Sequence, residues 1–341
     1  MNAQKEEKGL NILYLSLSDV IQAKLTLKDA VAIVEDSLRE HGEKQVENPP
    51  KLPIHPLPDA FINAMPAFLP RKNICGMKWV SGFPTNVPKG LPTIAAIIVL
   101  NDPQNGMPLA VMDGTYITAL RTVAVSAVAT KHLCNQDAST LAIVGCGVQG
   151  KYHAIALSYI VPSLTVVKIY DNYEPSIKFF VDEITKRVPA LKIEICSSPE
   201  ETIRNADLIV TATGKLLEPI YKNAWVKEGA LVLPVHTQGW DSSTASQMDK
   251  LVVDDWEQFR TVGDILYQPL PEKPHAETGE IVAGLKPGRE NKKERIVNFN
   301  KGLAIHDILM ANTVLAKSQK MGLGTKLTIL KPEKQLPIFD L

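Results

Sequence analysis

The sequence predicts an α/β fold in which a doubly wound parallel sheet is joined to a second, discontinuous α+β domain. The length of 341 residues fits two domains. From residue 141 onward, short apolar runs alternate with helical or loop segments, and most runs are continuously apolar, as in strands buried on both faces of a parallel sheet. A glycine-rich turn connects the first of these runs to a helix.

The composition is that of a globular protein without excess charge. Hydrophobic residues make up 45% of the chain, and Lys plus Arg equals Asp plus Glu at 37 each. We therefore expect no nucleic acid or membrane partner, and no apolar run is long enough to span a bilayer. The polar N-terminus lacks a signal-peptide core, which favours a cytoplasmic protein with reduced cysteines. The histidines show no metal-binding spacing, so no metal site is expected.

The first part of the chain mixes helical and strand patterns. Residues 26–40 are predicted to form a helix, with Thr26 and Asp29 as a capping pair at its start. The proline-rich ENPPKLPIHPLP should be extended. Strands are predicted at GMKWVSGF, LPTIAAIIVLND and MPLAVMD, followed by a helix at ITALRTVAVSAVATKHL. The last two strands are joined by a turn that contains Asn105-Gly106, a hairpin signal.

The parallel sheet is assigned to residues 133–312. Its strand candidates are LAIVGC, VVKIYD, KIEICS, LIVTAT, ALVLPV and KLVVDD. The segment GLAIHDILMANTVLAKSQKMG should form a last helix that packs back on the first domain. Residues 1–132 and 313–341 are therefore expected to make one discontinuous domain.

The stretch LAIVGCGVQGKYHAIAL has the order strand, glycine turn, helix, and a second strand comes next. Gly145 permits the tight turn, Gly147 lets the backbone approach a pyrophosphate, and Gly150 lets the helix sit close to the strand. Backbone N–H groups at the helix start would face the phosphates. The alternative is a glycine turn that binds nothing. We favour a nicotinamide dinucleotide site in a Rossmann-type domain.

Asp171 bears on the choice of dinucleotide, because it ends the second strand about 20 residues beyond the last glycine. A carboxylate there would bind the ribose hydroxyls and repel a 2′-phosphate. The next residues, Asn172, Tyr173 and Glu174, supply no arginine to hold such a phosphate. NAD(H) is therefore favoured, with NADP(H) as the alternative. Further cofactor-binding residues are expected in the loop and after a later strand: Val148, Gln149, Thr211, Ala212 and Thr213.

Several segments resemble the ornithine cyclodeaminase/mu-crystallin family. The stretch 99–133, VLNDPQNGMPLAVMDGTYITALRTVAVSAVATKHL, is similar to the family's strand, turn and helix around an LRTAA-like core. IVGCGVQG is similar to its dinucleotide loop, and GEIVAGLKPGR and GLAIHDILMA resemble its late segments. The resemblance implies a homodimer, with a substrate-binding and dimerisation domain built from both chain ends and a Rossmann domain between them.

Arg121 and Lys78 are the strongest candidates for binding and chemistry. Arg121 lies among small apolar residues, where a guanidinium needs an anion. It is either a structural arginine paired with a carboxylate elsewhere or, as the resemblance implies, a fork for the substrate α-carboxylate. Lys78 matches the family's strand lysine, which would stabilise charge or move a proton. The alternative for Lys78 is a strand lysine that reaches water.

The resemblance adds three more substrate-binding candidates. Lys51 falls where many members have a second carboxylate-binding arginine; lysine keeps the charge but loses the bidentate fork. Asn63 falls where ornithine cyclodeaminases tend to have an acidic residue, which argues against a second ammonium on the substrate. Thr93 matches a family threonine near the substrate. A solvated loop lysine and an ordinary strand threonine are the alternatives for Lys51 and Thr93.

Asp241 follows a strand at the carboxyl end of the sheet, where ligands of such folds bind. It matches the family's catalytic aspartate, which would exchange a proton with the substrate nitrogen. Helix N-capping is the alternative. The family usually has a proline and a basic residue after this aspartate, whereas here Ser242-Ser243-Thr244 follows. His236 is interpreted as an ordinary loop or core histidine.

The predicted function is an NAD-dependent imine reductase or amino-acid dehydrogenase, with hydride transfer at the α-carbon of a small amino or imino acid. Lys78 and Asp241 are the expected catalytic residues. Two alternatives stay open. One is ornithine cyclodeaminase, which forms proline and ammonia while NAD is recycled, and the other is a non-catalytic, nucleotide-dependent binding protein of the mu-crystallin type.

Overall fold

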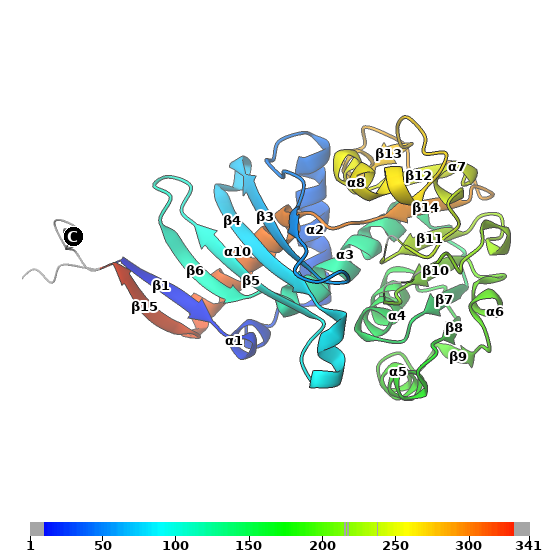
Figure 1. Cartoon of the computed structure of the whole chain (residues 1–341), viewed down its shortest axis with the longest axis horizontal. Helices are drawn as coiled ribbons and strands as arrows, with labels where there is room; N and C mark the ends of the chain where they lie inside the picture. Colours follow the sequence, from blue (N-terminus) through cyan, green and yellow to red (C-terminus); the bar gives the residue numbers. More distant parts are fainter. Residues whose placement is uncertain (1–9, 215, 217, 237, 331–341) are drawn as a thin grey trace, which may run out of the picture.

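The computed structural model describes residues 10–214, 216, 218–236 and 238–330. Within these ranges the chain forms two halves, each built around one β-sheet, which lie side by side along the long axis (Figure 1). The first half combines an N-terminal segment with the C-terminal helix and strand, and the second half is formed by the chain between them. This is the α/β architecture that the sequence predicts.

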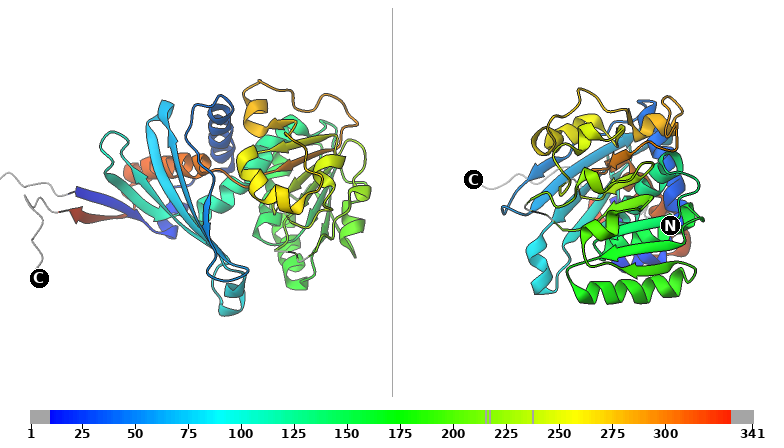
Figure 2. Two further views of the ribbon diagram at one scale, coloured as in Figure 1. Left: turned by 45° about the horizontal axis from the view of Figure 1, so that its top comes forward. Right: turned by 90° about the vertical axis from the view of Figure 1, so that its right-hand side faces the viewer.

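The sheet of the first half is mixed, with the order β15-β1-β6-β5-β4-β3-β2. Its strands are β1 (Leu10–Leu15), β2 (Leu52–Ile54), β3 (Phe61–Leu69), β4 (Ile74–Gly82), β5 (Ile94–Asn101), β6 (Pro108–Asp113) and β15 (Thr325–Leu330). Its helices are α1 (Leu17–Gln22), α2 (Leu27–Gly42), α3 (Thr115–Leu133), α10 (Ala304–Met321) and the 3-10 helices η1 (Pro70–Lys72) and η2 (Pro84–Lys89). Helix α10 contacts β3, β4 and β5 and lies along one face of the sheet (Figure 2).

The sheet of the second half has the order β13-β12-β14-β11-β10-β7-β8-β9, and its pairings are parallel. Its strands are β7 (Thr140–Val144), β8 (Val166–Tyr170), β9 (Lys192–Ile195), β10 (Leu208–Thr211), β11 (Leu231–Pro234), β12 (Lys250–Val253), β13 (Ala276–Glu277) and β14 (Ile296–Phe299). Its helices are α4 (Val148–Ile160), α5 (Glu174–Arg187), α6 (Pro199–Ile203), α7 (Thr244–Gln247), α8 (Trp256–Leu266), α9 (Thr278–Val282) and the 3-10 helix η3 (Asn223–Trp225). This is a Rossmann-type sheet.

The strand candidates of the second half are confirmed, and the continuous burial of most of them explains why their apolar runs were visible in the sequence. Strands β7, β10, β11 and β12 are buried along almost their whole length. Strand β14 was not predicted, although it inserts between β11 and β12. It has only four residues and includes the polar Asn298, so its apolar signal is short.

The predicted elements of the first half are also present. Helix α2 begins after Thr26, whose hydroxyl accepts from the Asp29 N–H in a reciprocal capping box. Strands β5 and β6 pair in an antiparallel hairpin, whose turn contains Gly106 at a φ of 75°. Strands β1, β3 and β15 were not predicted. The domain boundary expected at residue 312 falls inside α10.

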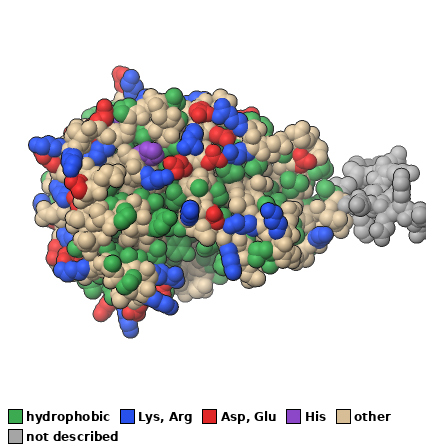
Figure 3. Space-filling model, turned by 180° about the vertical axis from the view of Figure 1, so that it is seen from behind, with side chains coloured by type: hydrophobic (Ala, Val, Ile, Leu, Met, Phe, Trp, Pro, Cys, Tyr) green, Lys and Arg blue, Asp and Glu red, His purple; other side chains and the backbone are tan. Residues whose placement is uncertain are grey.

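The face drawn in Figure 3 shows no single-sign field, and the described helices include no membrane-length apolar segment. On the face that Figure 3 shows, positive and negative side chains are interspersed. In the described part of the chain, no helix combines the length and apolar character that crossing a bilayer requires. The cysteines are unpaired, and no cluster of His, Cys, Asp or Glu suited to a metal ion occurs among the described residues.

The two halves meet where α3 packs on α4 and where the C-terminal end of α2 contacts α9. A side chain on Gly42 would place its Cβ 2.1 Å from the Gly279 carbonyl oxygen, so only glycine allows this approach. Next to it, His41 Nε2 lies 3.3 Å from Asp255 Oδ2, and Lys44 Nζ lies 2.6 Å from a Glu277 oxygen. This contact fixes how the halves face each other.

Gly42→Ala should lower the free energy of unfolding by about 1–3 kcal/mol, because the added methyl overpacks a backbone contact. Gly214→Ala is the matched control, since an added Cβ there meets no atom within 4 Å. Urea unfolding measures both. Equal losses in the two variants would show that the close contact is not the cause.

Candidate active site

The glycine loop after β7 has a geometry that two of its glycines, Gly145 and Gly150, make possible. Gly145 has a φ of 105°, and an added Cβ would lie 2.6 Å from the Ala212 carbonyl oxygen. At Gly150 an added Cβ would lie 2.0 Å from the Gly145 oxygen, which lets α4 sit against the strand. At Gly147, by contrast, nothing lies within 4 Å. The loop is therefore tightly packed on one side and open at the residue expected to approach a pyrophosphate.

The residues present fit a dinucleotide at this loop. Gly147 is the N-cap of α4 and supplies no capping side chain, so the first N–H groups of the helix can receive a phosphate. Asp171, at the end of β8, accepts hydrogen bonds from the backbone N–H groups of Cys146, at 2.7 Å, and Tyr173, at 3.0 Å. The Asp171 carboxylate is thus fixed beside the loop.

The other expected cofactor residues lie around the same loop but have defined protein contacts. Val148 is exposed at the start of α4. Gln149 donates to the Ala119 carbonyl oxygen at 3.4 Å, which links α4 to α3. The Thr211 hydroxyl accepts from Trp240 Nε1 at 3.1 Å, and the Thr213 hydroxyl lies 3.0 Å from that of Tyr221. Ala212 lies against Gly145 through its carbonyl group.

A buried ion cluster joins three elements of the first half. Lys78 on β4 and Asp307 on α10 are fully buried, with Nζ 2.5 Å from Oδ2. Arg121 on α3 is nearly buried and donates from Nε to Asp307 Oδ1 at 3.3 Å. Arg121 pairs with a carboxylate, as expected for a structural arginine. It also has further N–H donors, as expected for a residue that binds a substrate carboxylate.

The remaining donors of Arg121 are its two terminal nitrogens, Nη1 and Nη2. Among the described residues, no hydrogen bond is made by its Nη1 or Nη2 atoms, while Nε is taken by Asp307. Gly302 lies so close that a Cβ there would be 2.3 Å from Nη1. A guanidinium with its two terminal nitrogens unpaired is suited to a bidentate carboxylate.

Burial sets the protonation of this cluster. Burial, and then the positive charge of Arg121, lowers the pKa of Lys78 to about 7. Burial alone would raise the pKa of Asp307, but Lys78 and Arg121 outweigh it and hold that pKa below its usual value. Lys51 behaves like Lys78, because burial and Arg121 lower its pKa to about 7. Both lysines can therefore gain or lose a proton near neutral pH.

Lys51 lines a cleft of about 650 Å³ between the two halves. Its ammonium donates to the Lys301 carbonyl oxygen, and its backbone N–H lies 3.4 Å from Gln258 Oε1. The cleft lies beside the carboxyl end of β11, where Val235 follows the strand. Its lining also includes Pro50, Pro53, His55, Phe61, Asn63, His236, Thr261, Val262, Ile265 and Asn300. The expected residues Lys51 and Asn63 thus share one cavity.

Asp241 and Thr93 have other surroundings. Asp241 Oδ2 accepts a hydrogen bond from the backbone N–H of Asn223 at 3.0 Å. The backbone N–H of Asp241 donates to the backbone carbonyl oxygen of Tyr221 at 2.9 Å. Thr93 precedes β5, and its carbonyl oxygen accepts from Phe83 N–H at 2.8 Å. Neither belongs to the described lining of the cleft, whereas His236, interpreted as an ordinary histidine, does.

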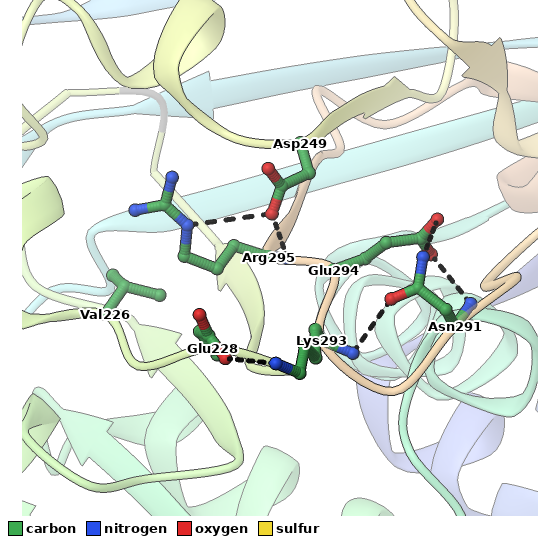
Figure 4. Close-up of a pocket in the computed structure, with 7 residues that line it drawn as sticks. All are labelled: Val226, Glu228, Asp249, Asn291, Lys293, Glu294 and Arg295. Atoms are coloured by element: carbon green, nitrogen blue, oxygen red, sulfur yellow. Dashed lines mark hydrogen bonds and ion pairs between the residues drawn. The ribbon is translucent and has the colours of Figure 1, made fainter.

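A second cavity, of about 550 Å³, lies at the amino ends of β11, β12 and β14 (Figure 4). Its charged side chains pair with one another, as in Arg295 with Asp249 and Lys293 with Glu228. Ligands of open parallel sheets bind at the carboxyl ends of the strands. This cavity is on the wrong edge of the sheet to serve the glycine loop.

The sequence model of the Ornithine cyclodeaminase/mu-crystallin family matches residues 13–321. The chain belongs to this family. The nodulation efficiency protein NfeD of Rhizobium meliloti, a relative, is 38% identical over 318 residues, which cover 92% of this chain and 98% of NfeD. The resemblance inferred from the sequence is thereby confirmed.

Solved structures place the chain among dinucleotide-bound proteins of similar fold. Delta(1)-pyrroline-2-carboxylate reductase of Thermococcus litoralis, in complex with NADH and L-proline, is 34% identical with a TM-score of 0.83, covering 92% of this chain and 99% of the reductase. An archaeal alanine dehydrogenase dimer with bound NAD is 33% identical with a TM-score of 0.85, covering 94% and 100%.

Two buried carboxylates of this ornithine cyclodeaminase/mu-crystallin family member were not predicted. Asp307 lies in the segment GLAIHDILMA, and Asp254 follows β12 and accepts from the Gly302 N–H at 2.5 Å. Each is an acidic residue next to an apolar run, and this position was the sequence signal from which a buried carboxylate could have been predicted. Burial raises the pKa of Asp254. Both carboxylates lie beneath the cations of the site.

Asp307→Asn should lower the free energy of unfolding by about 3–5 kcal/mol, because it leaves buried cations without their carboxylate. Adding Lys78→Met should recover part of this loss, since one of those cations is then removed as well. Denaturant unfolding of both single variants and the double variant measures the coupling. Additive losses would contradict a direct interaction.

Proposed function

We propose that the protein is an NAD-dependent oxidoreductase that interconverts an α-imino acid and the corresponding α-amino acid. The observation that carries this proposal is the guanidinium of Arg121, which Asp307 binds at Nε and whose Nη1 and Nη2 make no hydrogen bond among the described residues. One similar protein is a Delta(1)-pyrroline-2-carboxylate reductase in complex with NADH and L-proline, and another is an alanine dehydrogenase with bound NAD. The leading interpretation of the sequence is therefore retained.

In this proposal the chain anchors the substrate by its α-carboxylate. Arg121 offers two parallel donors, and Lys51 and Lys78 add positive charge around them. Anchoring the carboxylate fixes the α-carbon relative to the nucleotide, so alignment is achieved on binding. When bound, the dinucleotide supplies a hydride to the α-carbon of a protonated imine, which gives the amine and the oxidised dinucleotide.

Two residues are proposed to handle the proton on the substrate nitrogen. Lys78, with a pKa of about 7, is suited to give or take a proton near neutral pH. Asp241 stays a candidate for the same exchange, with its carboxylate held beyond β11 by the Asn223 N–H. The cleft between the halves would keep water away from the reacting imine.

We further propose a homodimer through the open face of the first sheet. Trp79, Ile97 and Leu109 are exposed on neighbouring strands of that sheet, although large apolar side chains usually avoid water. The similar archaeal alanine dehydrogenase is a dimer. A second copy of the chain packed on this face would remove these apolar side chains from water.

Turnover tests the function directly. The protein with NADH, ammonia and a series of 2-oxo acids should oxidise NADH and form the amino acid, and Arg121→Lys should lower kcat/KM at least roughly tenfold, because the bidentate fork is lost. In a parallel reaction, the protein is incubated with L-ornithine and substoichiometric NAD, and proline and NADH are measured. Proline in excess of NAD, without net NADH, would establish the cyclodeaminase instead. Absence of both reactions would favour a nucleotide-dependent binding protein.

Binding of the carboxylate should weaken as pH rises. Lys51 and Lys78 are charged below their pKa of about 7 and become neutral above it. The inhibition constant of a simple aliphatic carboxylate should therefore rise roughly tenfold or more from pH 6 to pH 9, the effect of losing a charged hydrogen bond. The affinity for NADH, measured by its fluorescence, serves as the control. A constant inhibition value over this range would contradict the assignment.

A further inference from the structure

Two lysines of the cleft lack a carboxylate partner of their own. Lys51 donates to the Lys301 carbonyl oxygen. Lys301 lies on the segment that runs from β14 to α10 between the two halves (Figure 1). Its ammonium donates to the Gln258 carbonyl oxygen at 3.3 Å and to the Thr261 hydroxyl at 2.9 Å. Within the described chain, neither lysine forms a direct ion pair with an acidic side chain.

The charges around the cleft do not balance. When Lys51 and Lys78 are protonated, the site holds four cations, namely Lys78, Arg121, Lys51 and Lys301. Among the described residues, the buried Asp307 and Asp254 are the carboxylates that interact with them. One substrate α-carboxylate would still leave an unbalanced positive charge in a partly desolvated site. Uncompensated charge in such surroundings is costly. A second negative group on the ligand would remove this imbalance.

The residues that line the cleft disfavour a ligand with a second positive charge. No Asp or Glu occurs among the described residues that line it. Besides the two lysines, its polar members are Asn63, Gln258, Thr261, Asn300 and the histidines His55 and His236. A second ammonium, such as that of a diamino acid, would meet two lysines and find no carboxylate. The remaining wall includes Phe61, Val262 and Ile265, which suit a short methylene chain.

We propose that the imino acid substrate carries a second carboxylate at the end of its side chain, and that Lys301 is the specificity-determining residue that binds it. This inference rests on the proposed function, because it takes the α-carboxylate to be held at Arg121. The substrate class is then a dicarboxylic 2-imino acid, derived from a dicarboxylic 2-oxo acid and an amine.

A matched pair of acids tests this proposal. With NADH and ammonia, kcat/KM is compared for 2-oxoglutarate and for its side-chain N,N-dimethylamide, which has no second charge and, lacking an N–H, cannot cyclise onto the oxo group. The dicarboxylic acid should be preferred by roughly ten- to a hundredfold, as expected for a hydrogen bond to a charged group. Lys301→Met, which keeps the length of the side chain and removes the charge, should bring this ratio close to one.

The control is Lys293→Met. Lys293 is 82% exposed and lies at the opposite edge of the second sheet, so this variant should keep the full preference. Thermal unfolding of both variants checks that they fold. The same ratio is also measured as binding, by calorimetry of each acid with the NAD-loaded protein, so that the result does not depend on turnover.

The outcomes separate the two proposals. Turnover or binding that is equal for the two acids, or stronger for the amide, would overturn the role of Lys301 and leave the reductase intact. A preference that survives Lys301→Met would overturn it too. Binding of the dicarboxylic acid that depends on Lys301, without turnover of any acid, would support the charge assignment while refuting the proposed reaction.

Discussion

The pairing of one buried carboxylate with two cations is the constraint on which the site depends. Asp307 holds the ammonium of Lys78 and the Nε of Arg121, although these residues come from a strand and a helix far apart in sequence. Moving such charges out of water costs several kcal/mol each, and their mutual attraction offsets that cost only with good geometry. The cluster therefore contributes orientation more than stability, since it directs the free edge of Arg121.

The function of that edge depends on how the two halves are oriented. The glycine loop belongs to one half and the ion cluster to the other, so a ligand that touches both must bridge the junction. The close contact of Gly42 with Gly279 and the pair of His41 with Asp255 hold this junction from the side of α2. The segment between β14 and α10 also spans this junction, since Lys301 hydrogen-bonds to Lys51 of the first half and to Thr261 of the second. Small rotations there would misalign a bound acid with the nucleotide.

Patterns within a short stretch of sequence predicted the features that depend only on that stretch. The order of strand, glycines and helix predicted the loop around Gly147, and the capping pair predicted the start of α2. Asp307 escaped prediction because it meets Lys78 across 229 positions, a separation that no spacing rule covers. Asn63 was expected near the substrate only from the family resemblance. The surroundings of Asp241 depend on Asn223, which precedes β11 while Asp241 follows it, and so could not be derived from the residues next to Asp241 in sequence.

The place of α10 near the end of the chain has a consequence for biosynthesis. A ribosome must add 186 residues between Arg121 and Asp307, which takes roughly 10–40 s at typical elongation rates. The second half is continuous in sequence, but its inner strand β14 is made only shortly before Asp307. The nascent N-terminal sheet meanwhile lacks both the helix that covers it and the carboxylate that neutralises its cations. Its exposed apolar face is then a target for chaperones until the last helix emerges and completes the fold.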